Sequence, residues 1–453
     1  MTRKKRNATP KRPALLRCAC LFLAVLLLLA SPVETFSYAI LAHQAIIDVL
    51  WESHLKPILR QKYPQATEDE LDAAEAYAYG GSIIQDVGYY PHGSTFVSDL
   101  THYVRSGDFV TALFRDSHDV YDYAFALGAL AHYATDVEGH SLATNRAVPL
   151  LYPKLRKKYG DHVTYEDDPL AHAKTEFGFD VLQVARGHYA SPDYHDFIGF
   201  EVSQPVLDQA FADTYGLELR DVLSNEDKAL NSYRHDVSTL IPKATRVAWS
   251  LKKSEIQAAE PGATHRRFLY NVSRAQYEKE YGKDYTQPTF GDKCLAFLYR
   301  LLPKFGPLRV LQLKLPTPET EKLFEASFNA SLDQYRKLLA QVKAGDLNFP
   351  NTNFDVGTPT PPGQYRMADN AQARLVHELA KQNFKGLTPA LRTEIVDYFS
   401  APDAHFSIKK DAKKWKQLQT ELAQLRDYKI PPSNQQKVDV SVPPVRESNV
   451  TLR

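Results

Sequence analysis

The sequence predicts an all-α protein, built as a multi-helix bundle with an additional helical region at its C-terminal end. Apolar residues recur at intervals of three and four along most of the 453-residue chain, which is the period of amphipathic helices. No convincing series of segments with alternating apolar and polar residues is present, and no internal repeat of solenoid or propeller length occurs. The composition, 43% hydrophobic and 24% charged, is that of a folded globular protein with a sizeable core.

The first 37 residues have the features of a secretory signal peptide. Seven basic side chains and one glutamate accompany the apolar run "LFLAVLLLLA", which is too short for a comfortable membrane span. We therefore expect a secreted or periplasmic protein; the alternative is a membrane anchor formed by an uncleaved signal. Without these residues the formal charge is −5, which argues against a nucleic acid as the obvious partner.

Cysteine usage limits how a secreted chain of this kind can be stabilised. Cys18 and Cys20 lie in the predicted signal, so the mature chain keeps only Cys294. An intrachain disulfide is then impossible, and the fold must be held by its core or by metal ions.

The predicted helices follow one another closely in the N-terminal half. Residues 40–63 have helical periodicity, and residues 67–82 add a capping box, with Thr67 as N-cap and Glu70 three positions later. Residues 85–103 are rich in Gly, Pro and Ser, and this composition predicts an ordered loop. Residues 117–145 are apolar almost all round, which predicts a helix in the middle of the bundle.

Further helical stretches occur in the C-terminal half, for example at 168–187, 237–257 and 319–345. The Pro/Gly/Thr-rich stretch "NFPNTNFDVGTPTPPGQY", at 348–365, predicts a linker. The predicted organisation is a signal peptide (1–37), a helical domain (38–260), a helical C-terminal extension (261–430) and a disordered tail (431–453).

The histidines are concentrated in the N-terminal half, and some keep regular spacings with carboxylates. On a helix His132, Asp136 and His140 lie within about 80° of one another, one turn apart. His172 and Glu176 share a face in the same way. Imidazole nitrogens and carboxylate oxygens are the ligands that zinc prefers, and the carboxylates balance its charge.

The same spacing also occurs on ordinary helix surfaces, so it is not specific by itself. His118 and Asp122 repeat it, yet they precede His132 by 14 residues, about 21 Å along a helix, and cannot share its site. A helix that ended at Gly139 would break the face that includes His140. His54, His92 and His162 have no such spacing and are interpreted as surface or loop residues.

Taken in chain order, these residues resemble the zinc-dependent bacterial phospholipase C family. The resemblance covers about residues 38–180 and implies an all-helical domain that binds three zinc ions. Asp86 matches the loop aspartate, and His102 matches the histidine after a loop containing "STF". Asp136 matches the carboxylate that bridges two ions. The implied zinc ligands are His43, Asp86, His102, His132, Asp136, His140, His172 and Glu176.

Two positions differ from the bacterial pattern. His140 comes four residues after Asp136, whereas the bacterial enzymes have six; the shorter gap is similar to the N-terminal domain of glycosylphosphatidylinositol-specific phospholipase D. Tyr38 stands five residues before His43, the separation seen in the related fungal zinc nucleases. Signal cleavage after Ser37 would make the Tyr38 amine a further zinc ligand, but cleavage after Ala39 is equally consistent with the sequence.

The resemblance implies hydrolysis of a phosphodiester, with a phospholipid or membrane surface as the partner and no specific nucleic acid. Asp86 is the candidate catalytic residue, as the group that orients or deprotonates water or as a plain zinc ligand. Phospholipase D-type cleavage, single-strand nuclease activity, and a non-catalytic envelope-binding protein stabilised by metal are the alternatives. Tyr89, Tyr90 and Phe96 are candidates for a head-group pocket or for core anchors; Val87 stands where choline-binding enzymes carry a tyrosine.

Overall fold

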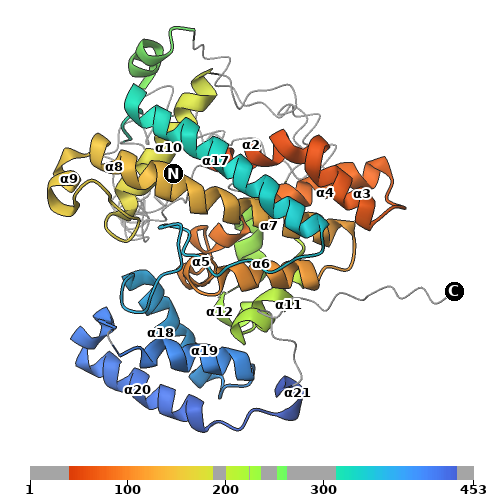
Figure 1. Cartoon of the computed structure of the whole chain (residues 1–453), viewed down its shortest axis with the longest axis vertical. Helices are drawn as coiled ribbons and strands as arrows, with labels where there is room; N and C mark the ends of the chain where they lie inside the picture. The colour runs from red at the N-terminus through yellow and green to blue at the C-terminus, as the bar shows by residue number, and fades with distance from the viewer. Residues whose placement is uncertain are drawn as a thin grey trace, which may run out of the picture.

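The computed structural model describes residues 40–186, 200–223, 225–235, 252–262, 313–402 and 404–435 (Figure 1). These residues form helices joined by short connections, and the all-α prediction is confirmed. Within the described ranges there is no β-strand, only an isolated bridge between Asn353 and Thr358. The predicted signal peptide lies outside the described residues. No helix in the described ranges combines the length and the hydrophobicity needed to span a membrane.

The helices of the N-terminal half surround one central helix, α7. In chain order they are α2 (Ile40–Leu50), the π-helical turn η1 (Trp51–Leu55), α3 (Lys56–Lys62), α4 (Glu68–Gly81), the 3₁₀ turn η2 (Ile84–Tyr89), α5 (Thr95–Tyr103), α6 (Ser106–Arg115) and α7 (Val120–Gly139). They are followed by the π-helical turn η3 (His140–Thr144), α8 (Asn145–Leu151), α9 (Pro153–Tyr159), α10 (Pro169–Arg186), α11 (Gln204–Tyr215), α12 (Leu219–Val222) and α13 (Glu226–His235).

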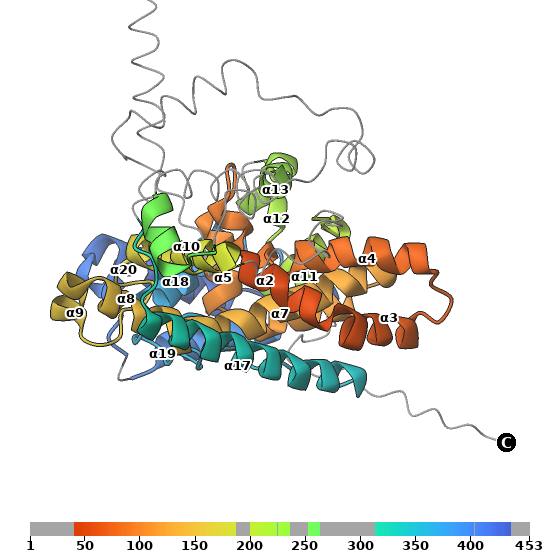
Figure 2. The ribbon, with the colours of Figure 1, turned by 90° about the horizontal axis from the view of Figure 1, so that it is seen from above.

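The later elements pack against this first set of helices. They are α17 (Pro318–Lys343), α18 (Arg366–Lys381), α19 (Pro389–Ser400), η7 (Ser407–Lys410), α20 (Ala412–Asp427) and α21 (Pro432–Gln435). Helix α17 lies against α7 (Figure 2). The Tyr335 hydroxyl of α17 donates a hydrogen bond of 2.8 Å to the Leu127 carbonyl of α7. Helix α18 packs against α5. The domain boundary at residue 260 stays a prediction, but α17 and α18 contact the N-terminal helices directly.

Two local expectations about the N-terminal helices have clear outcomes. The capping box is confirmed, because the Thr67 hydroxyl accepts from the Glu70 amide and the Glu70 carboxylate accepts from the Thr67 amide. The expectation of a loop over 85–103 is wrong for its second half, which is helix α5. Its apolar residues Phe96, Val97 and Leu100 share one helical face and are buried. The turn-forming residues before Ser94 obscured this face.

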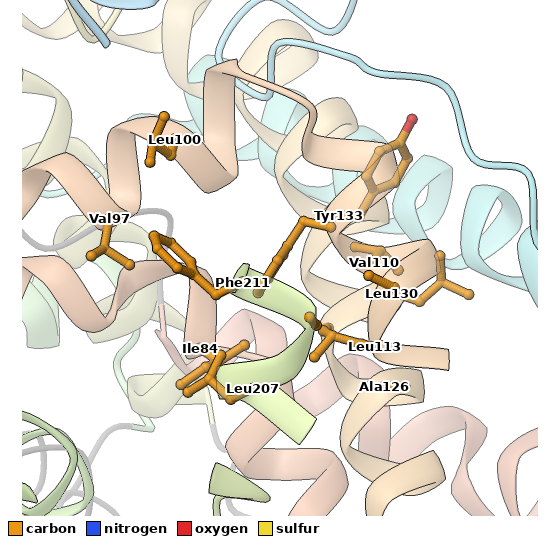
Figure 3. Packing of buried hydrophobic residues seen from close by; sticks show 14 of the residues in the cluster. Ile84, Val97, Leu100, Val110, Leu113, Ala126, Leu130, Tyr133, Leu207 and Phe211 are labelled. Carbon is orange, nitrogen blue, oxygen red and sulfur yellow. The ribbon is translucent and has the colours of Figure 1, made fainter. Parts of the chain in front are cut away.

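Helix α7 is buried along most of its length and forms the centre of the core. Figure 3 shows its residues Ala126, Leu130 and Tyr133 beside side chains of α6 and α11. Its contact with α4 is unusually close, because a Cβ at Gly128 would lie 2.0 Å from the carbonyl oxygen of Ala78. Only glycine permits this distance between the two backbones. The close contact matters for the site, because it brings the end of α4 beside the metal-ligand face of α7.

Candidate metal centre

The structure brings all eight implied ligands from the described residues to one place inside the bundle. They come from six elements: α2, η2, α5, α7, the turn η3 and α10. Each is at most 4% exposed. The residues are His43, Asp86, His102, His132, Asp136, His140, His172 and Glu176. Tyr38 lies outside the described residues, so its proposed role as a ligand stays a hypothesis.

The face formed by His132, Asp136 and His140 does not break at Gly139. Helix α7 ends there, but the backbone continues into the π-helical turn η3, and His140 keeps helical dihedrals of −68° and −53°. Its Nε2 lies 3.9 Å from Asp136 Oδ1. Such π-helical turns inside longer helices are frequent at functional sites.

The described residues contain three groups that could each hold a metal ion. The groups are His43, His132 and Asp136; Asp86, His102 and His132; and His140, His172 and Glu176. In each group the three ligand atoms lie within 4.8 Å of one another. These sets of histidine and carboxylate ligands match the preference of zinc.

Asp136 belongs to the first group and also lies against the histidines of the second. Its Oδ1 lies 3.3 Å from His43 Nε2, and its Oδ2 lies 3.3 Å from His102 Nε2 and 3.2 Å from His132 Nε2. Two ligands of a tetrahedral zinc ion are about 3.3 Å apart, given bonds of about 2 Å. The two oxygens of one carboxylate therefore face two different candidate ion positions.

His132 belongs to both of the first two groups, but its hydrogen bonding leaves it only one ligand nitrogen. Its Nδ1 lies 2.9 Å from the Ser82 carbonyl, which only accepts hydrogen bonds, so this nitrogen carries the proton. Only Nε2 is left as a ligand, and it can bind a single ion. It lies 3.3 Å from His102 Nε2, and Asp86 Oδ1 lies 3.2 Å from that same atom. His132 therefore joins Asp86 and His102, with Asp136 as the bridge to His43.

Helix geometry also fixes His102 in the orientation of a ligand. Its Nδ1 donates to the Ser98 carbonyl one turn earlier in α5, at 2.8 Å, and this leaves Nε2 directed at Asp86 and Asp136. A backbone acceptor behind a metal-binding histidine sets both its tautomer and its ring orientation. His132 and His102 thus share the same supporting arrangement.

The third group lies where α10 approaches the turn η3. Glu176 Oε1 lies 3.0 Å from His172 Nδ1 and 3.3 Å from His140 Nε2. His172 Nε2 lies on the other side of the ring, 2.6 Å from the side-chain oxygen of Asn145. The amide oxygen only accepts, so His172 Nδ1 is the nitrogen available to an ion in this group.

Buried carboxylate oxygens without hydrogen bonds show that the residues fit a cation. Within the described part of the chain, both carboxylate oxygens of Asp86 and of Asp136 lack a hydrogen-bond partner, as does Glu176 Oε2. Burying charged oxygens without hydrogen bonds is costly, and native proteins rarely tolerate it without a reason. Divalent ions among the imidazoles would satisfy all of these oxygens.

The charged groups of the metal-free site shift one another's pKa values. Burial opposes a charge on His102, but Asp136 and Asp86 outweigh it and raise the pKa of His102 to about 10. Burial is likewise outweighed at His140, where Asp136 and Glu176 raise the pKa to about 9. Burial alone would raise the pKa of Asp136, yet the neighbouring imidazoles hold that pKa well below its ordinary value.

These shifts predict that zinc binding at pH 7 releases protons. His102 and His140 are protonated in the metal-free protein at that pH, and a ligand nitrogen must be neutral, so about two protons leave when the metal binds. Titration calorimetry in buffers of different ionisation enthalpy measures this number. Zinc uptake without any proton release would contradict the prediction.

A rise in pH should have opposite effects on the stability of the metal-free protein and on its affinity for zinc. Because the folded pKa of both histidines lies above the unfolded value, their contribution to stability is complete below about pH 6.5. Metal-free protein should lose it as the pH rises through about 9 and 10, whereas zinc affinity should increase over the same range.

Several residues near the site fall outside the expected set of ligands. Asp355 and Asn145 contact the third group, and nothing in their local sequence resembles a metal motif. His118 and Asp122 form no part of any group. The Asp122 carboxylate instead accepts from the backbone amide of His118, at 2.9 Å, which supports their interpretation as a surface pair.

The aromatic residues considered for a head-group pocket are mainly engaged in packing. The guanidinium of Arg374 lies 4.4 Å from the centre of the Phe96 ring, and Tyr90 packs edge-on against Tyr233. Tyr89 is different, because its ring lies 6.2 Å from His102 and 6.3 Å from Tyr165. Tyr89 thus lies beside one of the metal-ligand histidines.

Comparison with known proteins agrees with this geometry. The family model described as zinc dependent phospholipase C matches residues 41–225, which include all eight of these ligands. The search of curated proteins and the search of solved structures gave no significant match. Residues 41–225 therefore form a helical region that is similar to the zinc-dependent phospholipase C family.

Proposed function

We propose that the protein is a zinc-dependent phosphodiester hydrolase, and specifically a phospholipase C that acts on a phospholipid head group. The observation that carries this proposal is the position of Asp136, whose two oxygens each lie 3.2 to 3.3 Å from histidine nitrogens that face different ion positions. Adjacent cations suit a phosphodiester, whose non-bridging and leaving oxygens both carry negative charge during hydrolysis.

Zinc bound there would polarise the phosphoryl group and lower the pKa of a nearby water. The chain's own contribution is to hold the ligands rigid, through the carbonyls of Ser82 and Ser98 behind His132 and His102. Asp86 is the proposed catalytic residue. It is 2% exposed, and neither of its oxygens has a hydrogen-bond partner among the described atoms, so one can bind an ion while the other orients water.

The proposal includes three zinc ions per chain and secretion of the mature protein. Three ions correspond to the three groups of ligands, once His132 is placed with Asp86 and His102. Secretion is supported by the charged and apolar N-terminal sequence. N-terminal sequencing of secreted protein would test it together with Tyr38, since cleavage after Ala39 would remove that residue.

Product analysis with zinc-loaded protein tests the activity. On phosphatidylcholine vesicles we expect diacylglycerol and a phosphomonoester, with no comparable cleavage of single-stranded DNA. Phosphatidic acid would instead indicate phospholipase D-type cleavage. The Asp86→Asn variant should lose turnover about a hundredfold or more, the range typical of a general base.

Two results would contradict parts of this proposal. Turnover of neither substrate by fully metallated protein would favour a non-catalytic role for the metal centre. Full turnover by Asp86→Asn with all of its zinc retained would exclude an essential role for Asp86 and leave the hydrolase assignment standing.

A further inference from the structure

The segment between α17 and α18 lies against the metal centre, although the family match ends more than a hundred residues earlier. The Phe354 amide donates to the carbonyl of His102 at 3.1 Å. The ring of Phe354 lies 5.1 Å from that of His102 and 5.9 Å from that of His132. A stretch whose composition predicts a linker therefore covers two of the zinc-ligand histidines.

Several specific contacts hold this segment in place. The Tyr133 hydroxyl donates to the Pro350 carbonyl at 2.9 Å, and the Ser106 hydroxyl donates to the Thr352 carbonyl at 2.6 Å. Gly357 has a positive φ of 74°, and a Cβ there would lie 2.9 Å from the Val137 carbonyl. The segment thus approaches the backbone of α7 directly beside the ligand face, at a position that requires glycine.

Asp355 belongs to this segment and lies beside two histidines of the third group. Its Oδ1 lies 3.7 Å from His140 Nδ1 and 3.6 Å from His172 Nε2. Both are the ring nitrogens on the side away from Glu176, which faces His140 Nε2 and His172 Nδ1. One carboxylate oxygen therefore faces the outer nitrogens of both imidazoles.

The rest of Asp355 is held firmly. Its Oδ2 accepts from the Tyr165 amide at 2.8 Å and from the Tyr365 hydroxyl at 2.6 Å. Its backbone carbonyl accepts from the Asn145 amide group at 2.6 Å, and Asn145 in turn accepts from His172. Asp355 is 1% exposed, and Oδ1 has no hydrogen-bond partner among the described atoms.

We propose that Asp355 is a positioning residue of the metal centre, which orients His140 and His172 from behind and supplies negative charge to the ion that they and Glu176 would hold. Within that group Glu176 is the only anion, so a divalent ion there keeps a surplus positive charge that Asp355 balances. A carboxylate behind a metal-binding imidazole also makes the imidazole a more basic ligand. The inference rests on the proposed zinc chemistry.

The test compares Asp355→Asn with a closely matched control. Asp369 is also 1% exposed and also accepts from a tyrosine hydroxyl, at 2.6 Å, and from a backbone amide, at 2.9 Å, but both donors, Tyr398 and Gly363, lie outside the three metal groups. In Asp355→Asn the remaining oxygen can keep the Tyr165 and Tyr365 hydrogen bonds. The amide nitrogen then faces the imidazoles, where it supplies no negative charge.

The measurement is zinc release from the full-length protein against increasing concentrations of a chelator, followed as ions lost per chain. In Asp355→Asn we expect one ion to leave at about 10- to 100-fold lower chelator activity, with the others unchanged. Asp369→Asn should match the wild type in every step. Thermal unfolding of both variants in excess chelator reports any loss of stability that is unrelated to metal.

The outcomes separate this inference from the proposed function. Wild-type protein without zinc would overturn the proposed function, and the inference with it. Zinc in the wild-type protein, together with the same release curve for Asp355→Asn and Asp369→Asn, would overturn the inference alone.

If Asp355→Asn does not fold, Asn145→Ala serves instead, because it removes the amide that joins Asp355 to His172. An unchanged release curve in that variant would also overturn the inference.

Discussion

Replacing Asp136 by asparagine should remove two of the three proposed zinc ions and lower kcat/KM about a thousandfold or more. The variant loses the negative charge that lies between His43, His102 and His132, and an amide nitrogen replaces one ligand oxygen. Metal ions contribute several kcal/mol to transition-state stabilisation, and about 4 kcal/mol corresponds to a thousandfold change in rate. Zinc content and phospholipid turnover of the purified variant measure the two effects.

Asp122→Asn is the matched control for this change. Asp122 follows His118 by four residues, as Asp136 follows His132, and both aspartates lie on α7. Its carboxylate accepts from the His118 amide and from the Ser203 hydroxyl, at a distance from the ligands. The control should keep its zinc and its turnover. Equal losses in the two variants would mean that the His-x-x-x-Asp pair at Asp136 has no special role.

The second large effect is expected at the crossing of α4 and α7. Gly128→Ala would place a Cβ 2.0 Å from the Ala78 carbonyl oxygen and 2.8 Å from the Ser82 nitrogen, so the two helices must separate. We expect a loss of about 3 kcal/mol or more in the free energy of unfolding, measured by denaturant titration. Zinc affinity should also fall, because the Ser82 carbonyl that orients His132 moves with α4.

Gly160→Ala separates this packing effect from a general intolerance of glycine replacement. No atom lies within 4 Å of a Cβ at Gly160, but its φ of 92° is unfavourable for alanine. With ψ at −156° this backbone conformation is almost confined to glycine, so the expected cost is about 1 to 3 kcal/mol from backbone strain alone. A Gly128→Ala variant no less stable than Gly160→Ala would show that the helices separate without appreciable cost.

The parts of the site that lie within one helix could be predicted from residue spacing. The 3.6-residue period alone places His132 beside Asp136, and His172 beside Glu176. It could not show that α2, α5 and α10 bring His43, His102 and His172 to the same place. That expectation came from the resemblance to a family, because contacts between helices depend on packing that spacing does not specify.

Other features were not predictable from the local sequence. The continuation of the ligand face through His140 depends on a π-helical turn, and Gly139 by itself favours a helix end. Asp355 lies in a stretch whose Pro, Gly and Thr content predicts a linker, and its position depends on contacts with Asn145, Tyr165 and Tyr365. Local composition predicts backbone tendencies but not what a loop packs against.

The most direct test of the central claim is an anomalous difference map, recorded at the zinc absorption edge from crystals of the full-length protein. The account predicts three peaks: one between His43 and Asp136, one among Asp86, His102 and His132, and one among His140, His172 and Glu176. A map without a peak at these residues, from protein supplied with zinc, would contradict it.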